Sequence, residues 1–134
     1  MSGTADPCRP KLLLIEDHPD GAESMRLLLQ HLGYDVRVAR TGPEGVQLGA
    51  AWEPDVVLCD IGLPGLDGYG VVQALRQLPA AARALMIALT GYARQEDKAR
   101  ALEAGFDHHI PKAEDLQTLL HLLPRTCLGE ADPS

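Results

Sequence analysis

The sequence predicts an α/β fold, in which a parallel sheet of five strands is covered by helices on both faces. Five short apolar runs alternate with five helix-like segments along the 134-residue chain, and such alternation is typical of parallel sheets with helical crossovers. The first, third and fourth runs are almost continuously apolar, as central strands are, whereas the second and fifth have the mixed composition of edge strands. With right-handed crossovers, edges at two and five favour the strand order 2-1-3-4-5.

The elements can be placed individually from their periodicity and their end signals. The expected strands cover residues 11–16, 36–39, 55–60, 84–90 and 108–110. The first helix is expected over 22–32, where Gly33 ends it, and the second follows the capping-box spacing of Thr41 and Glu44 and runs to about Ala51. Three more helices are expected over 68–77, 95–104 and 114–123. The result is a doubly wound (βα)5 sandwich of three layers, the flavodoxin-like arrangement, with Trp52 packing the second helix against the sheet.

Composition restricts the function classes. The formal net charge of −7 disfavours nucleic-acid binding, which needs clustered Lys and Arg. Cys8, Cys59 and Cys127 have neither disulfide-framework nor zinc-site spacing, which favours a reducing cytoplasm. No apolar stretch approaches the ~18 residues of a membrane span. We expect a flexible leader over 1–10, one domain over 11–124 and a flexible tail over 125–134, too short to hold a DNA-binding or enzymatic output domain.

Chemically useful side chains follow four of the five strands. Glu16 and Asp17 follow the first strand, Asp60 ends the third, Thr90 ends the fourth, and Lys112 follows the fifth. In a doubly wound sheet the functional crevice lies beyond these carboxyl ends, where the strand order reverses. Crowded carboxylates favour a hard cation such as Mg²⁺. Asp60 could then act as a nucleophile toward phosphorus, with Lys112 and Thr90 stabilising the phosphoryl oxygens.

Four motifs in this order make the chain similar to a known family. They are ED (16–17), DIGLPGLDG (60–68), ALTG (88–91) and GFDHHIPK (105–112). Over roughly residues 11–123 the sequence resembles response-regulator receiver domains of the CheY-like superfamily, and the stretch 89–109 is most similar to receivers of hybrid histidine kinases. The resemblance implies a bacterial two-component or phosphorelay phosphoprotein.

The resemblance also implies a role for each matching residue of the pocket. Asp60 would be the phosphorylation site, and its phosphoryl group would come from phosphohistidine on a histidine kinase or histidine phosphotransfer protein. Asp17 would bind Mg²⁺ directly, Glu16 largely through water, and the backbone carbonyl of Gly62 would complete the metal site together with Asp60. Lys112 would pair first with Asp60 and then with the phosphate.

Thr90 and His109 would form the switch that reads the phosphate. Thr90 would bond a phosphate oxygen and His109 would rotate inward behind it, which changes the surface of the helix at 95–104, the fifth strand and the last helix. A downstream protein target or kinase would read that surface, and a weak dimer could form through it. The family usually has proline just after the lysine, whereas here Pro111 precedes Lys112 and Ala113 follows it. A cis bond without proline costs about 3 kcal/mol, so we expect a trans bond there.

The residues after the first strand disfavour two other classes of protein. A magnesium-dependent phosphohydrolase would place a second acid two residues after its nucleophile on the first strand, but His18-Pro19 follow Asp17. A flavin-binding module would need a loop rich in Ser, Thr and Gly there, which is also missing. A receiver that serves only as an unphosphorylated docking surface stays open. His18, His31 and His121 are not spaced as metal ligands and are expected at the surface. The sequence therefore favours a signalling phosphoacceptor that catalyses only its own phosphorylation and dephosphorylation.

Overall fold

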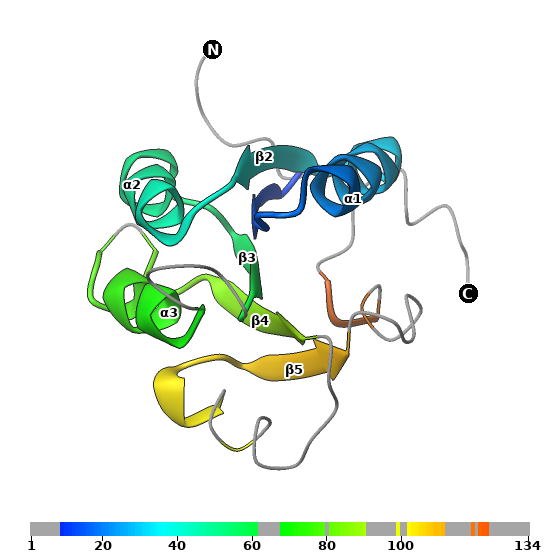
Figure 1. The fold of residues 1–134 in the computed structure, drawn as a ribbon. Coiled ribbons are helices and arrows are strands. Elements are labelled where there is room, and N and C mark those ends of the chain that lie inside the picture. Colours follow the sequence, from blue (N-terminus) through cyan, green and yellow to red (C-terminus); the bar gives the residue numbers. More distant parts are fainter. Residues whose placement is uncertain are drawn as a thin grey trace.

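Five parallel strands form one sheet in the order β2-β1-β3-β4-β5 in a computed structural model of the chain (Figure 1). The structure describes residues 9–61, 68–79, 81–90, 99, 102–111, 119 and 121–123. The predicted strand order is confirmed, with β2 and β5 at the two edges of the sheet. The crevice expected from the topology is therefore at the carboxyl ends of β1 and β3.

The strands begin and end within one residue of their predicted positions. They are β1 (Lys11–Ile15), β2 (Asp35–Ala39), β3 (Val56–Asp60), β4 (Leu85–Thr90) and β5 (His108–Pro111). All five residues of β3 are buried, and four of the five in β1 are. In β2, Asp35 and Arg37 are exposed. Continuous apolar runs thus form the buried centre, and the alternating run forms an edge.

Three helices are described with both ends: α1 (Pro19–His31), α2 (Gly42–Trp52) and α3 (Gly68–Arg76). The start of α1 was predicted three residues too late, because His18 is its N-cap and accepts a 3.5 Å hydrogen bond from Gly21 through Nδ1. The predicted cap of α2 is confirmed: Thr41 Oγ1 accepts from the N–H of Glu44 at 3.2 Å. Residues 99, 102–104, 119, 121 and 122 are helical and fall inside the last two predicted helices.

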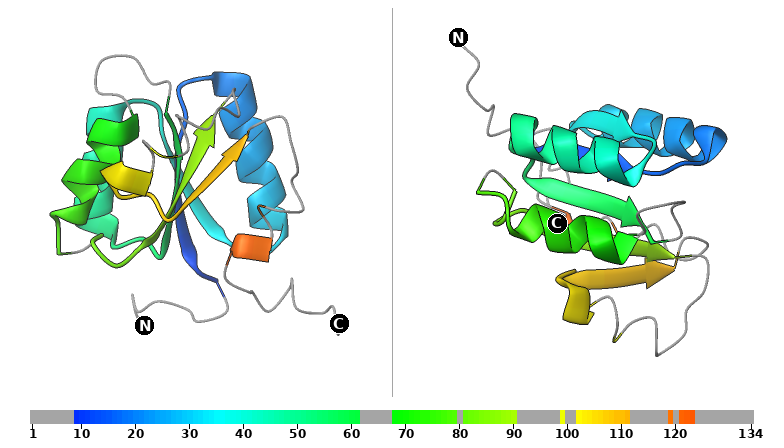
Figure 2. Two further views of the ribbon diagram at one scale, coloured as in Figure 1. Left: turned by 90° about the horizontal axis from the view of Figure 1, so that it is seen from below. Right: turned by 60° about the vertical axis from the view of Figure 1, so that its left-hand side comes forward.

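The helices cover both faces of the sheet and give three layers (Figure 2). On one face α2 and α3 enclose a core that includes Leu13, Ile15, Val57, Met86 and Leu75. On the other face α1 packs against Leu12, Leu14, Leu58 and Ile87, together with Leu119 and Leu123 from the end of the described chain. Alternate residues of each central strand therefore enter different cores.

Helix α2 packs against its neighbours through glycines on its buried side. A Cβ atom on Gly45 would lie 2.6 Å from Ile15 Cδ1, and one on Gly49 would lie 2.3 Å from Leu75 Cδ2. These separations are well inside van der Waals contact. The absence of side chains at the two positions thus sets the spacing of α2 from β1 and α3.

Trp52 anchors the carboxyl end of α2 to the sheet, as predicted. Its side chain is only 8% exposed. The Arg37 guanidinium carbon lies 4.6 Å from its ring centroid and Lys11 Nζ lies 5.9 Å away. Lys11 Nζ also donates to the Trp52 carbonyl at 3.1 Å. The ring thus joins β1, β2 and α2 at the amino ends of the strands.

A search of the described residues for a membrane-spanning helix finds no segment of sufficient length and apolarity.

Candidate functional site

Three predicted site residues meet at the carboxyl ends of the two central strands. Glu16 and Asp17 directly follow β1, and Asp60 is the last residue of β3. Because Ile15 is paired with Cys59 in the parallel ladder, the next residues, Glu16 and Asp60, come to the same point at the edge of the sheet. One carboxylate oxygen from each of Glu16, Asp17 and Asp60 lies within 4.8 Å of the others. The geometry therefore brings Asp60 close to Glu16 and Asp17, from which the sequence separates it by more than forty positions.

The environment of these acids makes their crowding costly. Glu16 is 4% exposed and Asp60 is 8% exposed, whereas Asp17 lies at the surface. Near a protein surface, two like charges about 5 Å apart repel by about 3 kcal/mol. Three carboxylates this close together favour the binding of a cation that they share. The three residues fit Mg²⁺, which takes oxygen ligands and keeps several of its waters.

Glu16 is held in place by the backbone around it. Its N–H donates to the Ala39 carbonyl at 3.0 Å, which continues the β1–β2 ladder by one bond. Its Oε2 accepts a 3.2 Å hydrogen bond from the N–H of His18. His18 lies at the surface, as the sequence predicts, but neither this bond nor its role as an N-cap was predicted. The proline after His18 was the available signal, since proline is favoured at the first position of a helix.

The other predicted pocket residues are described in part. Leu89 is paired with Asp60, so Thr90, the next residue of β4, has its backbone at the same edge of the sheet. Thr90 is itself paired with Pro111, the last residue of β5. Lys112 follows Pro111 directly in the sequence. Gly62, Lys112 and Ala113 lie outside the described residues, as does the Thr90 hydroxyl, so their roles stay predictions.

His109 is described within β5 and faces the side of the sheet covered by α2 and α3. It is paired with Ala88, which belongs to the core on that side. Its side chain is half-buried. Adjacent strand residues point to opposite faces, so His108 faces the side of α1. Rotation of His109 on phosphorylation stays a prediction.

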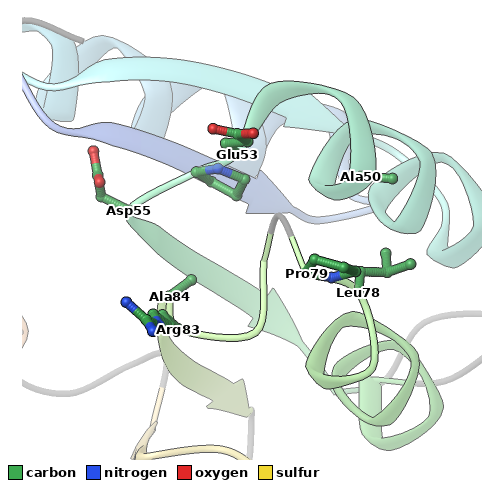
Figure 3. Close-up of a pocket in the computed structure, with 8 residues that line it drawn as sticks. Ala50, Glu53, Asp55, Leu78, Pro79, Arg83 and Ala84 are labelled. Atoms are coloured by element: carbon green, nitrogen blue, oxygen red, sulfur yellow. The ribbon is translucent and has the colours of Figure 1, made fainter.

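A separate cavity of about 550 Å³ lies at the opposite, amino end of the strands (Figure 3). Its apolar residues include Leu78 and Pro79, and its charged residues are Glu53, Asp55 and Arg83. The charged residues are all exposed. None of the residues predicted for the phosphorylation site lines this cavity, and it groups no set of side chains suited to phosphoryl transfer.

Comparison with known sequences agrees with the geometry of the site. The profile of the response regulator receiver domain matches residues 12–124. The chain is 33% identical over 118 residues to the "Uncharacterized 14.6 kDa protein in sodA1 3'region" of Leptolyngbya boryana, covering 88% of this chain and 90% of that protein. It spans about half the length of longer curated relatives, for example 53% of a cell cycle response regulator, CtrA, from Brucella ovis, at 33% identity over 90% of this chain.

Solved structures show the same fold. The receiver domain of the sensor histidine kinase PA1611 from Pseudomonas aeruginosa PAO1 has a TM-score of 0.77 and 31% identity, with 84% of this chain and 93% of that chain covered. That structure has a magnesium ion coordinated in its active-site cleft. A response regulator from Burkholderia pseudomallei has a TM-score of 0.78 and 25% identity, with 86% of this chain and 66% of that chain covered. That protein contains a phosphorylated aspartic acid and a calcium ion.

Proposed function

Because the chain belongs to the response regulator receiver domain family, we propose that it accepts a phosphoryl group on Asp60 from a phosphohistidine. The donor is a histidine kinase or a histidine phosphotransfer protein of a bacterial two-component system or phosphorelay. The observation that carries the proposal is the meeting of Glu16, Asp17 and Asp60 within 4.8 Å. Asp60 is the one of the three that ends a buried central strand.

Each residue has a distinct task in the transfer. An Asp60 oxygen attacks phosphorus, the bond from phosphorus to the donor's imidazole nitrogen breaks, and the imidazole leaves with the electron pair. Glu16, Asp17, Asp60 and the carbonyl of Gly62 would hold Mg²⁺. When bound, that ion supplies positive charge that relieves the repulsion among the acids and stabilises the phosphoryl oxygens. The ammonium of Lys112 and the hydroxyl of Thr90 bond the remaining phosphoryl oxygens.

Receiver domains are signalling phosphoacceptors rather than enzymes that turn over an independent substrate. In this chain the output of phosphorylation is a changed surface, formed by the helix around 95–104, β5 and the last helix. Thr90 and His109 switch that surface for a downstream protein or kinase in the cytoplasm. Besides forming the aspartyl phosphate, the domain catalyses only its hydrolysis.

Labelling by acetyl phosphate, with and without Mg²⁺, tests the proposal by intact mass. We expect one phosphoryl group per chain, formed only with Mg²⁺ and removed by hydroxylamine. Asp60→Asn should abolish the label, whereas Asp20→Asn, at an exposed acid in the first turn of α1, should leave it intact. Persistent labelling of Asp60→Asn would contradict the assignment. Turnover of p-nitrophenyl phosphate well beyond one equivalent would instead indicate a phosphohydrolase.

A further inference from the structure

Arg76, the last residue of α3, bonds two other segments of the chain, residues 82–84 and residues 105–107. Its Nε and Nη2 donate to the carbonyl of Gly105 at 2.9 and 2.7 Å. Its Nη1 donates to the carbonyls of Ala82 and Ala84 at 2.9 and 3.0 Å. Its Nη2 also donates to Asp107 Oδ2 at 2.9 Å. These bonds use all five N–H donors of the guanidinium, so the side chain has one fixed position.

Asp107 connects Arg76 to the sheet. The same oxygen that Arg76 bonds, Asp107 Oδ2, accepts from the N–H of Met86 at 2.9 Å. The N–H of Asp107 donates to the Met86 carbonyl at 2.7 Å. Asp107 and Met86 thus pair one position before Ile87 and His108, the first pair of the β4–β5 ladder. Arg76 thus positions the Asp107 carboxylate that bonds Met86.

Among the described residues, the pairing of β5 with β4 has few other contacts that would fix its register. The strand has four residues and lies at the edge of the sheet, where β4 is its only partner in the described ladder. A slip by one residue would turn each side chain to the opposite face. His108 would then take the place of His109, so the two adjacent histidines do not distinguish the registers by themselves. Ile110, 5% exposed in the core on the α1 side, opposes the slip from one face, and Asp107 opposes it from the other.

We propose that Arg76 is a positioning residue of the phosphorylation switch. Through Asp107 it fixes the register of β5, so that His109 and not His108 faces the α3 side of the sheet. The inference rests on the proposed function, because it assigns Arg76 a role in the response to phosphorylated Asp60. Arg76 would act on the register of β5 and thereby on His109. The phosphoacceptor chemistry would still belong to Glu16, Asp17 and Asp60. Asp107 and His109 are two residues apart in the chain and therefore lie on one face.

The register is measured first without any phosphodonor. In ¹⁵N-labelled full-length protein, amide contacts between residues 107–109 and 86–88 report the β4–β5 pairing by NMR. We expect one set of signals for the unaltered protein and additional or broadened signals for β5 in Arg76→Met. Asp107→Asn, which keeps an oxygen for Met86 but loses the charge, should give a smaller effect. Arg26→Met, at an arginine paired with Glu23 on α1, is the matched control and should leave β5 unchanged.

The response to phosphorylation is measured next, with acetyl phosphate and Mg²⁺. Intact mass reports labelling of Asp60, and the ring signal of His109, assigned with His109→Gln, reports the switch. We expect Arg76→Met to label to the same extent as the unaltered protein and to lose half or more of the change at His109. A merely structural role would reduce both readouts together, and that result would overturn the inference.

The remaining outcomes separate this inference from the proposed function. If the unaltered protein is not labelled, the proposed function fails, and the NMR register experiment still decides whether Arg76 sets the pairing of β5. An unchanged register and an unchanged His109 response in both variants would overturn the inference while the phosphoacceptor function stands. If Arg76→Met does not fold, the same criteria apply to Asp107→Asn.

Discussion

At the carboxyl ends of the strands, Glu16, Asp17 and Asp60 bring three carboxylates within 4.8 Å, whereas at the amino ends two acids, Asp55 and Asp107, accept hydrogen bonds from cationic or backbone donors. There, Asp55 Oδ2 accepts from the N–H of Lys11 at 2.9 Å, and Asp107 is bonded by a guanidinium and a backbone N–H. At the carboxyl ends the carboxylates repel one another, and a bound cation can relieve that repulsion. At the amino ends the two acids are bonded by donors of the protein itself. Local conflicts of this kind are expected at functional sites and not in supporting structure.

Substitutions at the two ends of the strands should have different effects. At the amino ends, a substitution should lower the free energy of unfolding and leave metal binding unchanged. At the carboxyl ends, a substitution should remove metal binding and cost little stability.

The largest effect is expected from Arg76→Met at the amino ends. The substitution removes every hydrogen bond of the guanidinium and leaves Asp107 without its charged partner. Hydrogen bonds to charged groups contribute about 1.5–3 kcal/mol, and this group is half-buried, so we expect the free energy of unfolding to fall by about 3 kcal/mol. Urea unfolding followed by circular dichroism measures it. The control Arg26→Met should cost under about 0.5 kcal/mol, because this half-buried guanidinium bonds side chains of its own helix, Glu23 and Gln30. Equal losses of stability in the two variants would contradict the prediction.

The next effect is the stabilisation of the protein by Mg²⁺ at the carboxyl ends. A ligand that binds only the folded state adds about 2.7 kcal/mol at one hundred times its dissociation constant, and EDTA should abolish the gain. In Asp17→Asn most of the gain should disappear. Without metal this variant should be slightly more stable than the unaltered protein, because one of three like charges is gone. A full Mg²⁺ response in Asp17→Asn would show that the exposed acid is not a ligand.

Gly49→Ala should lower the free energy of unfolding by about 2 kcal/mol, as overpacked cores do. The new Cβ would lie 2.3 Å from Leu75 Cδ2, so the fully buried Leu75 side chain would have to shift among its core neighbours. Gly21→Ala is the matched control, since its Cβ would meet only His18, at 3.9 Å. It should be neutral or stabilise by up to about 1 kcal/mol. Because Gly49 is remote from the acids, Mg²⁺ should add the same stability to both variants as to the unaltered protein.

The smallest effect concerns pH at the amino ends. Burial raises the pKa of Tyr34 above its ordinary value of 10.0, because the ionised phenol would lose its hydration. The unfolded chain therefore releases this proton at lower pH than the folded protein does. The corresponding stability is present below about pH 10 and is lost as pH rises toward the folded pKa. Tyr34→Phe should show a shallower loss of stability than the unaltered protein between about pH 9 and about pH 11, and parallel curves would contradict this.

The strand order and the acid cluster could be predicted because both follow from the buried strands. A fully buried strand such as β3 has a continuous apolar run that the sequence displays directly. Once the strands are parallel, their carboxyl ends meet at one edge whatever the loops do. The positions of Glu16, Asp17 and Asp60 therefore needed no knowledge of side-chain geometry.

The features that escaped prediction depend on tertiary contacts or on unusual chemistry. The start of α1 was placed at Ala22, where the apolar period begins, because an imidazole is an uncommon N-cap. Arg76 and Asp107 are 31 residues apart, and a basic residue at the end of a helix is also explained by bonds to the last helix carbonyls. Neither residue type nor spacing indicates that the two would meet beside β4.

Trp52, the chain's single tryptophan, is also its natural fluorophore. It packs against Lys11 at the start of β1, and the five strand residues from Lys11 to the acid cluster span roughly 16 Å along β1. Its emission should thus report loss of the native state while staying nearly silent to metal or phosphoryl loading. We therefore expect this tryptophan to report the integrity of the fold in a way that does not depend on the signalling state.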